Sequence, residues 1–460
     1  MKFEKKLLMY AIGNVAAKFV SVALLPIYTR YLVPEDYGRA DIANSAVILI
    51  VSIIFIEVWT ALLRFLYEDQ DKSKVFTNVV AVSLIFTIPY CLVQSITNII
   101  LKTDFIFISI VYGFTFLINN LYQFMARGKG KNDLFVISGI IASCTQGVAA
   151  IILIYWFKFG AEVILIAPSI GYFISILYLE VKSRFSKDIQ WRLVDITYIK
   201  KIILFSIPLA LNTSAFWLIA NFNRYYIAYL MGFEYSSFVS ISSKFTLVIS
   251  LVASIYALVW QESAYENSSN NDRASYYSNM TRIYIALSAI LTALCIPISK
   301  ILFPIMIGRG YYEAKIILAP YFVATFLSGI STFLAQIFNA EKKTGLLMIS
   351  TVTGSMTNVV LMLVFASKLG LFAAPISLGL GYIVNIVSRY INIRKFVELK
   401  LEMNVILKAT SIITFGTITY YVLTNTLALL ISTITLCIFI VVVYKDIIKF
   451  LIKRTKAYCK

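Results

Sequence analysis

The stretch from Leu346 to Ile391 reads LLMISTVTGSMTNVVLMLVFA (346–366), SKLG (367–370) and LFAAPISLGLGYIVNIVSRYI (371–391). Each of the two apolar runs has 21 residues. As an α-helix, a run of this length extends about 30 Å, which is the thickness of the hydrocarbon core of a bilayer. Only four residues separate the two runs. The stretch therefore predicts two consecutive transmembrane helices joined by a short turn.

Runs of similar length recur from one end of the chain to the other. We place them at 9–31, 41–63, 77–100, 105–125, 134–157, 162–180, 202–230, 238–260, 283–306, 315–338, 346–366, 371–391, 404–424 and 427–447. The sequence thus predicts an all-α, polytopic membrane protein of about fourteen transmembrane helices.

The composition of the whole chain agrees with this class. Of the 460 residues 60% are hydrophobic and only 14% are charged, and the mean hydropathy is +0.83. Soluble globular chains average roughly 45–50% apolar and about 25% charged residues. A fold surrounded by water cannot bury so much apolar surface at this size, so we expect lipid to be the solvent.

The net charge of +18 would suggest nucleic acid in a soluble protein. Here the basic residues lie between apolar runs, so we expect no nucleic-acid partner. If the N-terminus is inside, 30 Lys and Arg residues fall on the cytoplasmic side and 8 on the outer side. This positive-inside asymmetry predicts an even helix count and cytoplasmic termini.

A weak internal repeat suggests how the helices are grouped. LVPEDYG from Leu32 resembles LMGFEYS from Leu230, and each follows an aromatic-rich helix end. Helices 1–6 and 7–12 would then form two lobes in parallel orientation, an arrangement that transporters use. We expect a six-helix lobe over 1–195, a second over 196–398, and an additional helix pair with a basic tail over 399–460.

The stretch GNVAAKFVSVALLPIYTRYLVPEDYGRA (13–40), followed by ALLRF (61–65), resembles the N-terminal signature of the polysaccharide flippases. GRGYYEA (308–314) with IILAPY (316–321) is a second similarity. These exporters of O-antigen, capsule and exopolysaccharide units share a superfamily with multidrug and toxin extrusion antiporters. The resemblance implies a place in the inner (cytoplasmic) membrane of a bacterium. It further implies transfer of undecaprenyl-pyrophosphate-linked oligosaccharide from the cytoplasmic to the outer leaflet, with H⁺ or Na⁺ as coupling ion. It also makes the polymerase of the same pathway a candidate partner besides membrane lipids.

Flipping breaks no bond, so the informative residues are ionisable or polar side chains within apolar helices, each costly unless it faces a partner or a cavity. Arg224 shares a helix face with Asn221 and Trp217. A cationic cavity would bind pyrophosphate by charge-assisted hydrogen bonds. We predict that it is lined by these and four further residues: Lys18, Arg64, Lys244 and Asn14.

Each of these residues also has a purely structural interpretation. Arg64 stands near a helix end, where basic side chains extend to the headgroups. Glu57 is predicted to couple transport to an ion, but it could equally neutralise a neighbouring Lys or Arg. If Arg224 has a buried acidic partner, Glu57 is the most plausible one.

Two rival functions use the same membrane setting. A cation-coupled multidrug antiporter would need acids deep in the N-terminal lobe, where the sequence offers chiefly Glu57. A membrane polymerase or ligase would need catalytic groups, whereas histidine is absent and every predicted outer loop is short. We therefore expect a transporter that is not an enzyme and has no cofactor and no metal.

Overall fold

The computed structural model describes residues 18–268 and 270–443. Among these residues the chain is helical throughout, with no strand, which confirms the all-α class. The chain divides into two compact units, residues 1–240 and 241–460. The predicted lobes, with limits at 195 and 398, follow the sequence repeat and stay a prediction.

In the first unit, residues 18–23 are helical. The elements that follow are α2 (Leu25–Tyr31), α3 (Pro34–Ile54), α4 (Val58–Glu68), α5 (Lys72–Ile85), α6 (Thr87–Ile100), α7 (Ile106–Gly128), α8 (Asn132–Tyr155), α9 (Val163–Ser183), η1 (Phe185–Asp188), η2 (Trp191–Leu193), α10 (Ile196–Met231) and α11 (Phe233–Phe245), which runs into the second unit.

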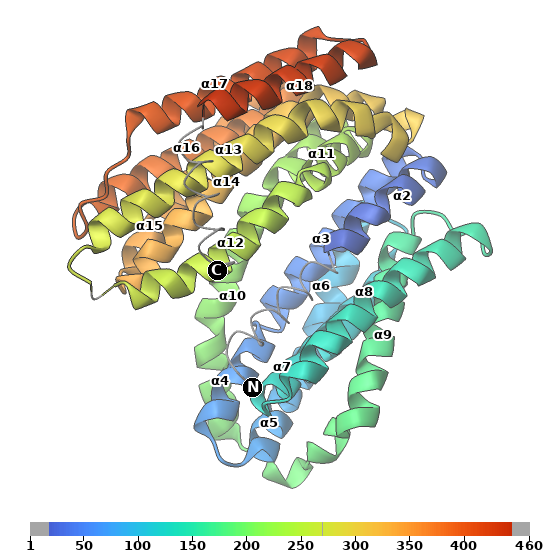
Figure 1. The fold of residues 1–460 in the computed structure, drawn as a ribbon. Helices are drawn as coiled ribbons and strands as arrows, with labels where there is room; N and C mark the ends of the chain where they lie inside the picture. Colours follow the sequence, from blue (N-terminus) through green and yellow to red (C-terminus); the bar gives the residue numbers. More distant parts are fainter. Residues whose placement is uncertain (1–17, 269, 444–460) are drawn as a thin grey trace. The chain divides into compact units, whose positions relative to one another are not determined.

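The second unit continues in the same way (Figure 1). Its elements are α12 (Leu247–Glu266), α13 (Arg273–Met306), η3 (Arg309–Ala314), α14 (Lys315–Ala340), α15 (Thr344–Leu369), η4 (Gly370–Phe372), α16 (Ala373–Ile393), α17 (Met403–Val422) and α18 (Thr426–Val443).

Every predicted span overlaps one of these helices or a broken helix pair. Among the described residues, eight helical stretches are long and apolar enough to cross a membrane, or ten if each of two bent pairs counts as one span. One of the eight, Gly345–Ile393, contains both α15 and α16. The multi-span architecture is thus confirmed, while fourteen stays a prediction based on apolar runs.

Three predicted helices are broken, and only the break between α5 and α6 lies near a Pro, namely Pro89 in the first turn of α6. The run 41–63 is divided between α3 and α4, the run 77–100 bends by 43° between α5 and α6, and the run 238–260 is divided between α11 and α12. At the first break, Ile56 and Glu57 have φ values of +46° and +55°. Left-handed backbone is disfavoured for residues with a Cβ, so surrounding contacts must hold this break.

The long helix α10 has a defined start and end. The Asp195 side chain accepts hydrogen bonds from the backbone N–H groups of Thr197 and Tyr198, which caps the first turn. Gly232 ends the helix with φ +105°, a conformation that favours glycine. With 36 residues, α10 is about 54 Å long, more than one bilayer crossing requires.

The segment between α9 and α10 is tied to the rest of the first unit by polar contacts. The Asn78 side chain donates to the Leu193 carbonyl (2.9 Å) and accepts from the Asp195 N–H (2.8 Å). Lys129 forms an ion pair with Asp188 (2.5 Å). These contacts fix the point from which α10 starts.

The last two helices form part of the second unit. α17 and α18 lie side by side, and both contact α13 (Figure 1). A Cβ at Gly416 would come within 2.8 Å of the Ala293 carbonyl oxygen, so α17 and α13 are in close backbone contact. The helix pair predicted as an addition is therefore packed against a helix of this unit.

Candidate functional site

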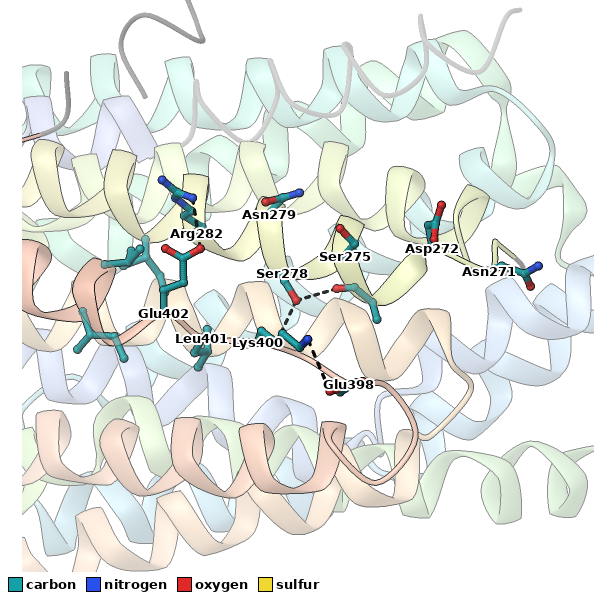
Figure 2. Close-up of a pocket in the computed structure, with 14 residues that line it drawn as sticks. Asn271, Asp272, Ser275, Ser278, Asn279, Arg282, Glu398, Lys400, Leu401 and Glu402 are labelled. Atoms are coloured by element: carbon teal, nitrogen blue, oxygen red, sulfur yellow. Dashed lines mark hydrogen bonds and ion pairs between the residues drawn. The ribbon is translucent and has the colours of Figure 1, made fainter. Parts of the chain in front are cut away.

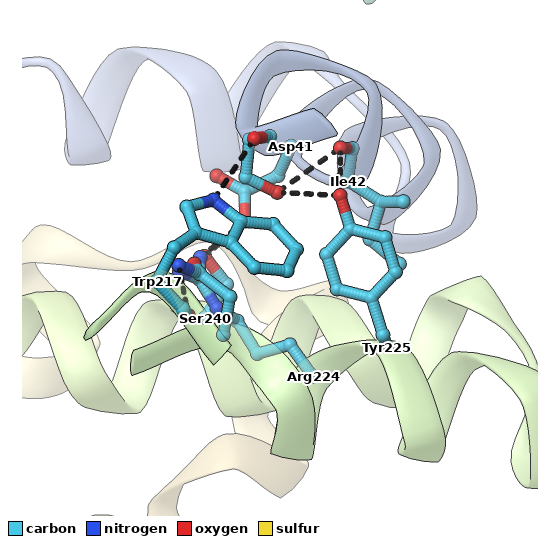
Figure 3. A network of polar contacts seen from close by, with 8 residues as sticks. Asp41, Ile42, Trp217, Arg224, Tyr225 and Ser240 are labelled. Atoms are coloured by element: carbon cyan, nitrogen blue, oxygen red, sulfur yellow. Dashed lines mark hydrogen bonds and ion pairs between the residues drawn. The ribbon is translucent and has the colours of Figure 1, made fainter. Parts of the chain in front are cut away.

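Arg224 lies on α10 and pairs with an acid on α3. Its Nη1 is 2.7 Å from Oδ2 of Asp41, and the side chains are 18% and 5% exposed. The Ser240 hydroxyl donates to the same Oδ2 at 2.8 Å (Figure 3). Arg224 Nη2 donates to the Asn221 side-chain oxygen. The guanidinium is thus held by partners on three helices, α3, α10 and α11.

Aromatic side chains extend this network along α10. The Trp217 indole donates to the Ser45 carbonyl (3.1 Å), and the Tyr225 hydroxyl donates to the Ile42 carbonyl (2.8 Å). The two rings meet edge to face, with centroids 5.1 Å apart (Figure 3). Trp217, Asn221 and Tyr225 are spaced by four residues, so they share one face of the helix. This face is held against α3 by hydrogen bonds at both rings.

The pair is electrically balanced. A charge within apolar helices is costly unless it is paired, and Asp41 supplies the counter-charge for Arg224. Because the carboxylate occupies Nη1, an anion can bind both Nη groups of this guanidinium only by replacing Asp41. We name the group Asp41, Asn221, Arg224 and Ser240 the Arg224 network.

The prediction that Glu57 would be the acidic partner of Arg224 is wrong. Asp41 takes this place because it lies on α3 opposite α10, whereas Glu57 lies beyond the end of α3. Sequence reasoning missed Asp41 because it stands at the edge of a predicted span. The signal was nonetheless present, since no charged residue occurs between Asp41 and Glu57.

Glu57 stands at the broken segment between α3 and α4. Its carboxylate accepts a hydrogen bond from the Thr60 hydroxyl at 3.0 Å, and the side chains of Ser52 and Thr213 lie near it. Its backbone N–H donates to the Ser52 carbonyl (3.1 Å). Thr213 lies on α10, the helix that also carries Arg224.

The other predicted site residues are dispersed. Arg64 is 59% exposed and forms an ion pair with Glu68 one turn away (2.6 Å), which matches its structural interpretation. Lys18 is half-buried in the first described helical segment, and Lys244 is half-buried near the end of α11. Asn14 lies outside the described residues. Of the predicted group, the structure brings together Arg224, Asn221 and Trp217.

The second unit contains a polar cavity of about 380 Å³ that the sequence did not predict (Figure 2). It lies between α13 and the segment before α17. Arg282 pairs with Glu402 (3.3 Å), and the Lys400 N–H donates to the Ser278 hydroxyl (3.0 Å). Charged side chains of both signs line this cavity and largely pair with each other, so it does not provide a positively charged binding site for a diphosphate.

No known family profile and no curated protein sequence matches this chain. Solved structures do share its fold. A lipid II flippase, MurJ in an inward closed conformation, has a TM-score of 0.69 at 14% identity, covering 96% of this chain and 100% of the other. An inward-facing multidrug resistance MATE family transporter of the MOP superfamily has a TM-score of 0.64 at 15% identity, with coverages of 87% and 94%.

A third structure with this fold comes from Pyrococcus furiosus. It is a MOP superfamily transporter described as having a binding pocket of reverse polarity, with a TM-score of 0.59, 15% identity and coverages of 90% and 96%. At such identities the likeness concerns the fold alone. The chain therefore has the fold of these proteins, which include a lipid II flippase and a multidrug resistance transporter.

Proposed function

We propose that this chain is a flippase that moves undecaprenyl-pyrophosphate-linked oligosaccharides from the cytoplasmic to the outer leaflet of a bacterial cell membrane. The transport would proceed by alternating access and be coupled to an ion. The fold shared with a lipid II flippase over nearly the whole chain supports this proposal. The observation that carries it is the Arg224 network, in which a guanidinium is kept among apolar helices by one carboxylate.

The proposed binding step is an exchange of partners. A diphosphate presents several oxygens to the planar fork of an arginine and can bind it bidentately. It would replace Asp41 at Nη1 of Arg224, while the Ser240 hydroxyl remains a donor to Asp41. The released carboxylate then keeps the hydrogen bond from Ser240, which lowers the cost of the exchange.

The other predicted residues have secondary parts in this proposal. Lys18, Lys244 and Asn14 would add positive charge and hydrogen bonds for the headgroup, and the exposed Arg64 would attract it at the cytoplasmic end of α4. Trp217 would offer a ring to a sugar only if its hydrogen bond to Ser45 opened.

A cation-coupled multidrug antiporter is the second candidate. It is favoured by Asp41, a buried acid in the first unit that could hold an organic cation if Arg224 moved away. The two candidates predict opposite roles for the pair, since an anionic substrate needs Arg224 and a cationic one needs Asp41.

The test uses a host whose surface polysaccharide depends on this chain. Lipid-linked oligosaccharide at the inner leaflet is measured in strains with Arg224→Lys, Arg224→Gln, Asp41→Asn and the double change Asp41→Asn/Arg224→Gln, at equal protein levels. The lipid-linked oligosaccharide should accumulate to an intermediate level in Arg224→Lys, which keeps part of the transport. In Arg224→Gln it should accumulate as in a strain with almost no transport. This accumulation should persist in the double variant, because removing Asp41 restores charge balance but not the diphosphate ligand.

Normal polysaccharide output from the double variant would contradict the flippase proposal, because Arg224 would then serve only to neutralise Asp41. Export of cationic dyes by the wild type, lost in Asp41→Asn but kept in Arg224→Lys, would favour the antiporter.

A further inference from the structure

The cavity beside Arg282 in the second unit has no part in the proposed transport of a diphosphate. Its volume is about 380 Å³ (Figure 2). Binding sites for small molecules occupy about 300–1,000 Å³, so the cavity is large enough for such a ligand. One wall consists of residues 271–285, which include the start of α13, and the other of residues 398–406, which lead into α17. Both walls belong to the second unit.

The lining of this cavity changes from polar to apolar along both walls. The polar and charged lining residues are Asn271, Asp272, Ser275, Ser278, Asn279 and Arg282 on one wall, and Glu398, Lys400 and Glu402 on the other. Apart from Ala274 and Leu401, the apolar lining residues are Ile285, Val405 and Ile406. These three lie beyond residues 283 and 404, where two predicted membrane spans begin. The cavity therefore crosses the predicted boundary between hydrocarbon and water, which is where lipid headgroups lie.

At this boundary the cavity holds a cation next to an anion. Nη1 of Arg282 is 3.3 Å from Oε1 of Glu402, and the two side chains are 41% and 53% exposed. Lys400 and Glu398 form a second pair at 3.7 Å, and both are still more exposed. Exposed ion pairs contribute little to stability, so their partners can be exchanged for groups of a ligand at little cost. A ligand with one negative and one positive group would provide new partners for both members of a pair.

We propose that this cavity binds the headgroup of a membrane phospholipid that carries a phosphodiester and a primary ammonium group, as phosphatidylethanolamine does. Arg282 would donate hydrogen bonds to the phosphate, and Glu402 would accept them from the ammonium group. Ser275 and Asn279 add a hydroxyl and an amide, and in the described part of the chain no hydrogen bond holds either side chain. The acyl chains would leave the cavity along Ile406, which is 38% exposed at its apolar end.

The lining distinguishes this headgroup from those of other phospholipids. An anionic headgroup requires an excess of basic side chains, whereas two basic and three acidic residues line the cavity. The quaternary ammonium of choline has no N–H to donate and is typically bound by aromatic rings. Within the described ranges, 18–268 and 270–443, no aromatic side chain lines this cavity. A primary ammonium group has three N–H donors, which suit the carboxylates.

A lipid bound in this way would connect two distant segments of the second unit. Arg282 and Glu402 are 120 positions apart in the sequence. A headgroup that contacts both adds contacts between α13 and the segment before α17. A ligand that binds only the folded state raises the melting temperature in proportion to its affinity and concentration. The site shares no residue with the Arg224 network, so the inference does not depend on the proposed flippase function.

The experiment uses the full chain purified in detergent. Its melting temperature is titrated with phosphatidylethanolamine, phosphatidylcholine and phosphatidylglycerol that have identical acyl chains, and the half-saturating concentrations give relative affinities. Glycerophosphoethanolamine, the water-soluble headgroup without acyl chains, is the fourth ligand. The variants are Glu402→Gln, Arg282→Gln and Asn279→Ala. Glu35→Gln and Arg39→Gln are the matched controls, because they remove the same charges from an ion pair in the first unit.

We expect the wild type and both controls to bind phosphatidylethanolamine at least about tenfold more tightly than the other two lipids, because only its ammonium group can donate to the carboxylates. Glu402→Gln should bind phosphatidylethanolamine and phosphatidylcholine equally. Arg282→Gln should bind both lipids more weakly, since both contain a phosphate. Asn279→Ala should weaken binding of phosphatidylethanolamine without removing an ion pair.

Three results would overturn the inference. These are equal affinities of the wild type for phosphatidylethanolamine and phosphatidylcholine, tighter binding of phosphatidylglycerol, and a preference that Glu402→Gln retains. Glycerophosphoethanolamine should bind at least about tenfold more weakly than the lipid, because it has no acyl chains to bury. Equal binding would show that the ligand is a soluble headgroup and not a membrane lipid. Equal melting temperatures of wild type and variants without ligand show that a loss of binding is not due to misfolding.

Discussion

Nη1 of Arg224 on α10 lies 2.7 Å from Oδ2 of Asp41 on α3, and 182 residues separate the two in the sequence. The pair places one cation and one anion between α3 and α10, which also meet through hydrogen bonds from Trp217 and Tyr225. Either charge alone would be strongly unfavourable there. The relationship therefore gives Arg224 a structural role as well as the proposed role in binding, and the two can be separated by mutation.

Replacing one partner of this pair should destabilise the protein more than replacing both. Arg224→Gln leaves the carboxylate of Asp41 buried and unpaired, for which we expect a loss of about 3–5 kcal/mol in folding stability. The double change Asp41→Asn/Arg224→Gln should recover most of it, as measured by melting temperature in detergent. Arg39→Gln is the control, since its pair with Glu35 is exposed and contributes about 1 kcal/mol or less. No recovery in the double variant would mean that the pair does not stabilise the fold.

Gly38 should not tolerate a side chain. A Cβ at this position would lie 2.0 Å from the carbonyl oxygen of Phe233, at the contact of α3 with α11. Because backbone atoms cannot move aside as a side chain can, Gly38→Ala should cost about 1–3 kcal/mol by overpacking. Gly139→Ala is the matched control, because its nearest contact would be the end of Gln123 at 3.9 Å. Equal melting temperatures for the two variants would show that α3 and α11 do not approach so closely.

Arg389 on α16 should stabilise the second unit through hydrogen bonds to two neighbouring helices. It is 6% exposed and donates to Ser331 on α14, to Ser350 (3.3 Å) and Thr351 (3.0 Å) on α15. An ammonium group cannot match this planar fork, so Arg389→Lys should lower the melting temperature and Arg389→Met should lower it further, by a loss of about 3 kcal/mol. The same two changes at the exposed Arg394 should have little effect. Similar melting temperatures for both sites would contradict the role of Arg389.

The positive-inside pattern gives a topological prediction. Reporter fusions after Lys201, Lys343 and Lys460 should be cytoplasmic, because basic residues collect on that side of the predicted spans. Fusions near Lys102, Arg309 and Lys368 should be external. A cytoplasmic reading near Arg309 would mean that the predicted number of crossings before it is wrong.

Much of the fold follows from local properties of the sequence. The length and spacing of apolar runs predicted every helix region, because lipid requires each span to satisfy its own backbone hydrogen bonds. The helix face shared by Trp217, Asn221 and Arg224 followed from helical periodicity in the same way. The broken helix at Ile56 and Glu57 did not, because neither Pro nor Gly marks it and left-handed backbone at such residues must be held by tertiary contacts.

The partner of Arg224 shows what one sequence leaves undetermined. Glu57 and Asp41 were both acids in the first unit, and periodicity places each on a face of its own helix without saying which helix lies opposite. The choice between them depends on how α3 packs against α10, which is a tertiary property. The same limit applies to the cavity beside Arg282, whose lining comes from segments more than one hundred residues apart.

Transfer of a lipid-linked oligosaccharide diphosphate by the purified chain tests the central claim most directly. The protein is reconstituted into liposomes carrying a fluorescent undecaprenyl-diphosphate oligosaccharide, and transfer between leaflets is followed by quenching from outside. The wild type and Arg39→Gln should transfer the lipid, Arg224→Lys should do so more slowly, and Asp41→Asn/Arg224→Gln should fail while remaining folded. Equal transfer by the wild type and this double variant would contradict the claim that Arg224 binds the diphosphate. Absence of transfer by the wild type under any pH or Na⁺ gradient would contradict the flippase function.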